Sequence, residues 1–168
     1  MMAVRLWTRI INLDYSVDLD SFHCDEPELD IWVHRDALEQ QEESSCAVHV
    51  ALDDSDEVIG IFTLSSYYLQ HRVIPQQTKD DTNLSGNIPC VLLGRLAVNK
   101  EYQGQSQGSL LVKEAIQRAR KNSVNVGCRF LYTQALNDDL IDWYRKLGFI
   151  SLPRNPRNML FDLKSQKQ

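Results

Sequence analysis

No run of apolar residues in this chain reaches the roughly 18 that a membrane-spanning helix needs. The apolar stretch nearest the start, Val4–Ile11, contains Arg5 and Arg9. It lacks the long apolar core and the small-residue cleavage site of a signal peptide. Both absences argue against insertion or export, so we expect a protein of the cytoplasm with no membrane partner.

Cysteine is scarce and scattered. The chain has four cysteines, none within four residues of another, so it contains no CxxC pair. His23 and Cys24 are adjacent, but no second pair stands at the spacing of a zinc finger. We therefore expect no metal site, and we expect the thiols to be small buried side chains in a reducing compartment.

The chain also lacks an arrangement typical of nucleophilic catalysis. The serine pairs at 44–45 and 65–66 have no histidine and aspartate near them in a recognisable setting. The histidines are scattered, and no internal repeat is present. Any chemistry must therefore come from another part of the sequence.

Basic residues are few in the first half of the chain. Residues 1–84 hold 17 acidic and 5 basic side chains, a net charge of −12, whereas residues 85–168 hold 6 acidic and 13 basic ones, a net charge of +7. Two solvated faces would explain this division. A second interpretation is a C-terminal half suited to phosphate groups and an N-terminal half suited to a basic partner.

The expected elements indicate one domain over 1–168, because 168 residues with 43% hydrophobic content can bury a sizeable core. Periodicity and turn signals predict alternating strands and helices, which is typical of an α+β fold with a mixed sheet. The predicted elements are helices over 27–41, from about 109 and over 138–146, strands over 46–52, 58–65, 88–98, 130–135, 149–152 and 159–163, and a loop or short helix within 69–87.

The most informative stretch is an apolar strand ending at Val98, followed by the turn Gln103–Gly108 and a helix beginning near Ser109. Such a turn gathers unpaired main-chain N–H groups at the positive end of a helix dipole, where phosphate binds well. Glycines allow the close approach. A plain strand-to-helix connection would show the same residues, so the motif alone leaves both interpretations open.

The turn belongs to a wider pattern. Leu93–Val98 precedes it, and Asp142–Phe149 follows downstream. Together these segments resemble the GNAT family of N-acetyltransferases, which use acetyl-coenzyme A. The resemblance implies a mixed, mostly antiparallel central sheet flanked by helices, with a splayed strand pair at the acetyl-CoA site.

The resemblance also implies a set of acetyl-CoA contacts. The family pattern aligns with Gln103 and Gly108, but Ser106 stands where an inner glycine is usual, which predicts weaker binding rather than its loss. The strand's main chain would pair with the pantetheine arm and polarise the thioester carbonyl. The implied contacts are Leu96, Ala97, Val98, Gln103, Gly104, Gln105, Ser106, Gln107, Gly108, Ser109 and Asn137.

Tyr144 is the catalytic residue that the resemblance implies. Attack of an amine on a thioester expels a thiolate, and a nearby phenol can supply its proton as a general acid. The spacing Tyr-x-x-x-Gly-Phe that begins at Tyr144 matches the family's tyrosine position. Leu140, Tyr144 and Leu147 also lie at i, i+4 and i+7, so a core aromatic is the alternative.

Further segments, at 22–24, 29–32, 88–89 and 134–137, are similar to one subgroup of the family. The subgroup is the acetyltransferase toxins of type II toxin–antitoxin modules, which acetylate the α-amine of aminoacyl-tRNA and block translation. The resemblance implies aminoacyl-tRNA as acceptor and a ribbon-helix-helix antitoxin as partner. It also allows a homodimer paired through C-terminal strands.

A tRNA acceptor needs cationic surface, and the acidic half would then suit a basic antitoxin. Two alternatives stay open: a GNAT enzyme acting on a small-molecule amine or a protein N-terminus, and a non-catalytic module that binds coenzyme A or a partner. The candidates for contact with tRNA are Arg95, Arg118, Arg120, Lys121, Arg154 and Arg157.

Overall fold

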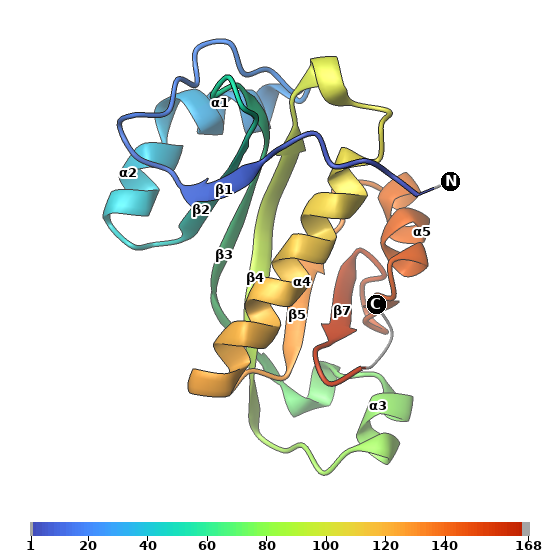
Figure 1. Ribbon diagram of the computed structural model, residues 1–168. Coiled ribbons are helices and arrows are strands. Elements are labelled where there is room, and N and C mark those ends of the chain that lie inside the picture. The colour runs from blue at the N-terminus through green and yellow to red at the C-terminus, as the bar shows by residue number, and fades with distance from the viewer. Residues whose placement is uncertain (1, 166–168) are drawn as a thin grey trace. The chain divides into compact units, whose positions relative to one another are not determined.

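The computed structural model describes residues 2–165, and their strands form one seven-stranded sheet in the order β1-β2-β3-β4-β5-β7-β6 (Figure 1). Strands β4 and β5 run parallel, whereas β1·β2, β2·β3, β5·β7 and β6·β7 are antiparallel. The α+β prediction is confirmed. The elements are β1 (Arg9–Asn12), α1 (Pro27–Arg35), α2 (Ala37–Glu42), β2 (Ala47–Leu52), β3 (Val58–Gln70), η1 (His71–Val73), α3 (Gln76–Asp81), β4 (Asn87–Val98), η2 (Lys100–Tyr102), α4 (Gln107–Asn125), β5 (Phe130–Gln134), α5 (Asp138–Lys146), β6 (Ile150–Ser151) and β7 (Asn158–Asp162).

The chain divides into two compact units, each assembled from separate stretches of sequence. Among the described residues, the first unit comprises 2–65 and 94–115, and the second comprises 66–93 and 116–165. The boundaries fall inside β3, β4 and α4, so these three elements contribute to both units.

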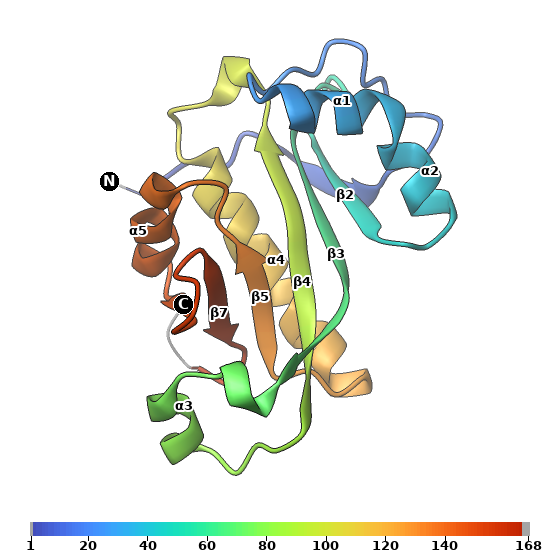
Figure 2. The same ribbon diagram turned by 180° about the vertical axis from the view of Figure 1, so that it is seen from behind.

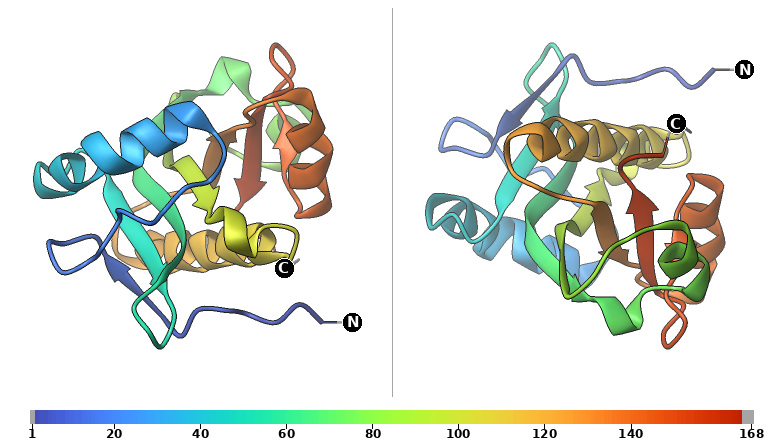
Figure 3. Two further views of the ribbon diagram at one scale, coloured as in Figure 1. Left: turned by 90° about the horizontal axis from the view of Figure 1, so that it is seen from above. Right: turned by 90° about the horizontal axis from the view of Figure 1, so that it is seen from below.

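The first unit has its core where α1 and α2, which follow one another along the chain, pack on β2 (Figure 3). Trp32 and Val33 of α1 and Ala37 of α2 are buried there. Phe22, in the segment before α1, is completely buried in the same core. Burying each large apolar side chain contributes about 2 kcal/mol to folding.

The second unit is built on β5, which lies between β4 and β7, with β7 antiparallel beside it (Figure 2). Its apolar core includes Phe130 and Tyr132 of β5 together with Leu160 of β7 and Ile74 of the segment before α3. Helix α5 has the predicted bounds, and it buries Ile141 and Tyr144.

Several element boundaries differ from the predictions. The helix predicted over 27–41 is two helices that meet at Asp36, where φ is −114° instead of the usual helical value near −63°. Strand β3 continues to Gln70, and helix α4 begins at Gln107 rather than near Ser109. The apolar segment that contains Ile10 and Ile11 forms β1, a strand that the sequence analysis did not predict.

Three further observations concern the described residues. None of their helices is long and apolar enough to cross a membrane. No group of three or more His, Cys, Asp or Glu residues among them could hold a metal ion. All four cysteines are free; Cys24 and Cys90 are buried, whereas Cys46 and Cys128 are partly exposed.

Candidate active site

In the second half of β4, alternate main-chain amides point toward β3 and away from it. The amide of Arg95 donates to the Thr63 hydroxyl of β3 at 2.9 Å, and the amide of Asn99 donates to the Ile59 carbonyl at 2.9 Å. Because peptide groups alternate in direction along a strand, the amides of Leu96 and Val98 point to the opposite edge. This is the arrangement that main-chain pairing with an extended ligand requires.

The pairing of β4 with β5 ends before this segment begins. The register runs from Cys90 opposite Phe130 to Leu93 opposite Thr133. Strand β5 ends one residue later at Gln134, whereas β4 continues to Val98. The segment Gly94–Val98 therefore extends past the paired part of the two strands, as expected for a splayed strand pair.

The turn that follows β4 has a backbone suited to an anion. Gly104 and Ser106 have φ of +74° and +63°, and helix α4 begins at the next residue, Gln107. Residues of alternating backbone handedness form a concave array of N–H groups that binds anions. The amides in the first turn of α4 have no helical carbonyl to bond, and the helix dipole adds positive potential there. This geometry fits a pyrophosphate.

Two glutamine side chains of the turn form hydrogen bonds to main-chain groups elsewhere in the first unit. Gln103 donates to the carbonyls of Cys24 at 2.8 Å and Val98 at 2.9 Å. The side chain of Gln107 is buried; it donates to Val4 and accepts from the amide of Leu6. These two side chains are engaged within the protein, so we expect the main-chain groups of the turn to be the ones that bind a cofactor.

Asn99, which the sequence analysis did not identify, anchors the start of the same turn. Its buried side chain donates to the Val58 carbonyl at 3.1 Å and accepts from the amide of Glu101 at 3.3 Å. In the same turn, the Glu57 carboxylate raises the pKa of Tyr102 to about 12. An asparagine directly after an apolar strand was the available signal.

Tyr144 lies in the second unit, on the buried face of α5, and is 6% exposed. Its ring meets those of Trp143 and Phe149 edge to face, with centroids 4.8 and 5.2 Å away. Burial raises the pKa of Tyr144 and outweighs Thr133, which acts to lower it, so the phenol keeps its proton at neutral pH. The residue is a packed aromatic that also carries a proton to donate.

Asn137 caps helix α5. Its side-chain oxygen accepts from the amide of Leu140 at 3.1 Å, so this oxygen is occupied by the cap. The side-chain NH2 group can still donate. A role for Asn137 toward the cofactor amide therefore rests on this donor.

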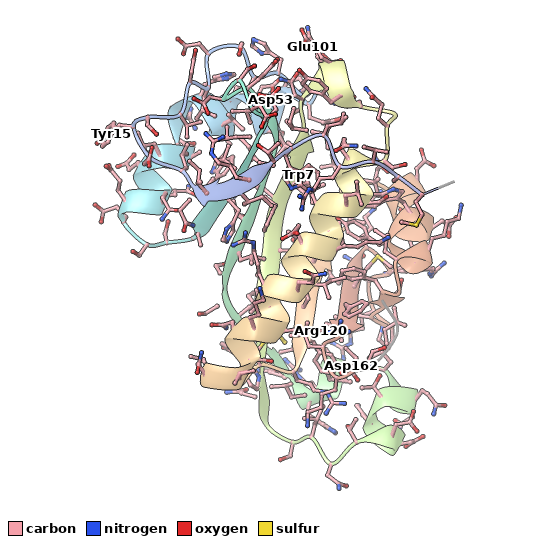
Figure 4. The ribbon with its side chains drawn as sticks, viewed as in Figure 1. Trp7, Tyr15, Asp53, Glu101, Arg120 and Asp162 are labelled. Carbon is pink, nitrogen blue, oxygen red and sulfur yellow. The ribbon has the colours of Figure 1, made fainter. Side chains whose placement is uncertain are left out.

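The side chains of the candidate cations differ in how many contacts they make within the protein. Arg95 lies over the buried ring of Trp32 with its guanidinium carbon 4.6 Å from the centroid. Arg120 donates to the carbonyls of Leu163 and Ser165, beside Asp162 at the end of β7 (Figure 4). These two are held by intramolecular contacts.

The remaining candidates are more varied. Arg157 pairs with Asp138 at 2.9 Å, and both line an open groove beside α5. Arg118 is partly buried, and Lys121 and Arg154 are exposed. Lys121 and Arg154 are therefore the candidates best placed to reach a nucleic acid.

The chain was compared with known proteins. The model of the Acetyltransferase (GNAT) family matches residues 9–149. The match spans the strand, turn and helices that carry the site. The chain belongs to the GNAT acetyltransferase family. It is an N-acetyltransferase. The family match is evidence against the alternative of a non-catalytic module.

Individual relatives share most of their length with this GNAT chain. A tRNA-acetylating toxin of Mycobacterium tuberculosis is 29% identical over 150 residues, 89% of each chain. The structure of AtaT complexed with acetyl-methionyl-tRNAfMet is 29% identical, with a TM-score of 0.85 and coverage of 93% of this chain and 95% of that one. A Tyr-to-Phe mutant of the AtaT toxin, bound to the C-terminus of the antitoxin AtaR and to acetyl-CoA, is 28% identical, with a TM-score of 0.77 and 93% coverage of each chain.

Proposed function

We propose that this protein is an acetyl-CoA-dependent N-acetyltransferase that acetylates the α-amine of aminoacyl-tRNA and so blocks translation. One observation carries the proposal: nearly the whole chain matches AtaT, a toxin solved with an acetylated aminoacyl-tRNA. Because charged tRNA is the acceptor in this proposal, we propose that the protein acts in the cytoplasm. The family match crosses both compact units, which supports a single catalytic domain.

The main chain of the first unit would hold the cofactor. Acetyl-CoA supplies an activated acetyl thioester when it is bound. The amides around Gly104, Ser106 and the first turn of α4 would bind its pyrophosphate, and Leu96–Val98 would pair with the pantetheine arm. A main-chain N–H of this strand would also stabilise the oxyanion that forms on the thioester carbonyl.

Tyr144 would act as the general acid. The acceptor amine attacks the thioester carbon, the C–S bond breaks, and Tyr144 donates its proton to the sulfur. The nitrogen loses one proton to water, and Tyr144 recovers one from water. Because burial keeps the phenol protonated at neutral pH, the acid is available without a metal or a second catalytic side chain.

The acceptor and the partner would meet surfaces of opposite charge. Exposed Lys121 and Arg154 would contact tRNA phosphates. The acidic segment before residue 85 would receive a basic antitoxin. The AtaT relative was solved with the C-terminus of its antitoxin AtaR bound. Reversing acidic charges within 14–30 should then weaken antitoxin binding; unchanged binding in a pull-down would remove this part of the proposal.

The test of the function is transfer of radiolabelled acetyl from acetyl-CoA to bulk charged tRNA. Label should appear on charged tRNA and be absent from deacylated tRNA, because only the aminoacyl ester carries an α-amine. A parallel reaction contains small-molecule amines and peptide N-termini. Label on these alone, with intact acetyl-CoA binding by calorimetry, would favour the other acceptor class.

A further inference from the structure

Two tyrosines near the end of β3 are exposed although one of them stacks on a buried aromatic ring. Tyr67 and Tyr68 lie in the part of β3 that belongs to the second unit, and they are 40% and 59% exposed. The ring of Tyr67 stacks on that of Tyr132 on β5, with centroids 4.9 Å apart and planes inclined by 9°. The ring of Tyr68 is 6.5 Å from that of Tyr67, with planes inclined by 29°. We call these three residues the tyrosine platform.

The platform is supported by the core of the second unit. Tyr132 is 3% exposed, and its hydroxyl accepts a hydrogen bond from Gln134 at 3.1 Å. Leu69, directly after the exposed pair, is buried in the same core as Tyr132. An aromatic ring that is already held in place loses little conformational entropy when a second flat ring binds to it. Tyr67 is therefore preorganised for stacking.

The platform lies close to the end of the pairing between β4 and β5. Strand β4 runs between β3 and β5 (Figure 2). Tyr132 stands opposite Leu92, and the next pair, Leu93 and Thr133, is the last in the register. The platform is thus one residue pair from the point where the two strands separate, in the unit that also carries Tyr144.

The charge of the second unit favours an anionic partner. Its described residues hold 11 basic and 6 acidic side chains, a net charge of +5, whereas those of the first unit hold 6 basic and 17 acidic ones, a net charge of −11. Next to the platform, the cations Arg72 and Lys79 are balanced by Asp80 and Asp81, so the excess of positive charge belongs to the unit as a whole. Exposed aromatic rings on a basic unit are typical of surfaces that bind single-stranded nucleic acid.

We propose that the tyrosine platform binds an unpaired base at the acceptor end of tRNA, by stacking of the base on the exposed ring of Tyr67. The inference rests on the proposed function, which makes charged tRNA the acceptor. The last nucleotide of a charged tRNA carries the amino acid, and this end of the molecule is unpaired. Unpaired bases stack on aromatic side chains whatever their sequence. Stacking on Tyr67 would hold the last nucleotide near the end of the β4·β5 pairing and so position the α-amine.

The first test compares Tyr67→Leu with Tyr67→Phe in binding to deacylated tRNA. Leucine still covers Tyr132 but has no aromatic face, whereas phenylalanine keeps the ring and lacks only the hydroxyl. Leucine should weaken tRNA binding by about fivefold to a hundredfold, and phenylalanine should leave it within about twofold. The salt dependence should not change, because stacking releases no counterions. Tyr15→Leu is the control: this residue is 79% exposed on the acidic first unit, and its variant should bind tRNA as wild type does.

The second test removes the base instead of the ring. Wild-type protein should bind a tRNA that lacks the unpaired nucleotides of its acceptor end at least as weakly as Tyr67→Leu binds intact tRNA. With the shortened tRNA, Tyr67→Leu should cause no further loss, because the ring has no base to stack on. A third measurement needs no variant and covers the case in which Tyr67→Leu does not fold. A tRNA that ends in a fluorescent adenine analogue should lose emission when it binds wild-type protein, because stacking quenches the analogue.

Each outcome decides between the alternatives. Unchanged tRNA binding by Tyr67→Leu, an equal loss with intact and shortened tRNA, or an unquenched analogue in the wild-type complex overturns the stacking site. Weaker antitoxin binding by Tyr67→Leu, with tRNA binding intact, would overturn it too and would make the platform a protein interface. If wild-type protein acetylates no charged tRNA while ring and base remain coupled in binding, the proposed reaction is wrong and the stacking site stands. Acetylation of charged tRNA with unchanged binding by Tyr67→Leu gives the reverse conclusion.

Discussion

Ser106 follows Gly104 by two residues, and both have the left-handed backbone conformation, with φ of +63° and +74°. A side chain makes this conformation costly, by about 1 kcal/mol or more. The backbone at position 106 therefore has the geometry for which glycine is usual in the family, although the residue is serine. The first prediction follows from this strain.

Replacing Ser106 by glycine should relieve the strain. We expect Ser106→Gly to raise the free energy of unfolding by about 0.5–1 kcal/mol, because the backbone strain is relieved. It should also tighten acetyl-CoA binding severalfold, because glycine allows the pyrophosphate a closer approach to the main chain. Denaturant unfolding measures the first effect and calorimetry the second. Weaker acetyl-CoA binding would show that the Ser106 side chain itself contacts the cofactor.

Gly104 provides the matched control. A Cβ atom added there meets nothing within 4 Å, so only the positive φ opposes a side chain. Gly104→Ala should lower the free energy of unfolding by about 1 kcal/mol through backbone strain alone. No loss of stability would indicate that the turn rearranges freely, and the expectation for Ser106 would then fail as well.

The phenol of Tyr144 should matter for turnover far more than for binding. We expect Tyr144→Phe to lower kcat about a hundredfold or more, while acetyl-CoA affinity stays within about twofold, because only proton donation is removed. Tyr132→Phe is the control: this phenol is also buried, but it accepts from Gln134 at 3.1 Å. Equal losses in both variants would point to general damage to β5 and α5.

The sequence was most informative where local patterns and burial agree. Helix α5 has the predicted bounds because Asn137 caps one end and Gly148, with φ of +103°, follows the other. The turn at Gln103–Gly108 was predicted from its residues, whereas the positive φ at Ser106 is known only from the structure. The ring of Tyr144 is packed in the core, as one of the two interpretations predicted, and its role as an acid stays a prediction.

Other features depend on contacts that are distant in sequence. Strand β1 forms by pairing with β2, and its short apolar segment around Ile10 does not predict a strand without that partner. Thr133 carries no local signal in the sequence, because its hydroxyl donates to the Leu93 carbonyl, 40 residues earlier in the chain. The sequence suggests that Arg120 is a surface cation, but its guanidinium donates to the Leu163 carbonyl, 43 residues further along the chain. Such partners are set by the tertiary fold.

Adjacent cations on α4 should therefore respond differently to substitution. Lys121→Gln should weaken tRNA binding severalfold and reduce the salt dependence of the affinity by about one phosphate contact, with stability unchanged. Arg120→Gln should lower the free energy of unfolding by about 1–2 kcal/mol, because the Leu163 and Ser165 carbonyls lose their donor. Filter binding over a range of salt and thermal unfolding separate the two. If Arg120→Gln were fully folded and lost tRNA affinity while Lys121→Gln did not, Arg120 would be the residue that contacts tRNA and Lys121 would not.

Acid should weaken the second unit through Asp162. Burial acts to raise the pKa of this carboxyl, but its hydrogen bonds to Arg129 at 2.9 and 3.0 Å and to the amide of Lys164 prevail, and the net pKa is lowered. A lowered folded pKa means that the stabilisation is complete above the ordinary value of 3.8 and is lost as the pH falls through the lowered one. Because Asp162 is 36% exposed, we expect the pair to contribute only about 0.5–1 kcal/mol.

The variant Asp162→Asn isolates this contribution. It should be less stable than wild type at neutral pH, and the difference should shrink as the pH falls below about 4, because the wild-type carboxyl then becomes protonated as well. Asp142→Asn is the control, since that exposed carboxylate lies 3.4 Å from an exposed Arg145. Urea unfolding across the pH range measures both. A difference between wild type and Asp162→Asn that persists unchanged in acid would mean that the asparagine disturbs packing at the end of β7, and that the ion pair with Arg129 is not the cause.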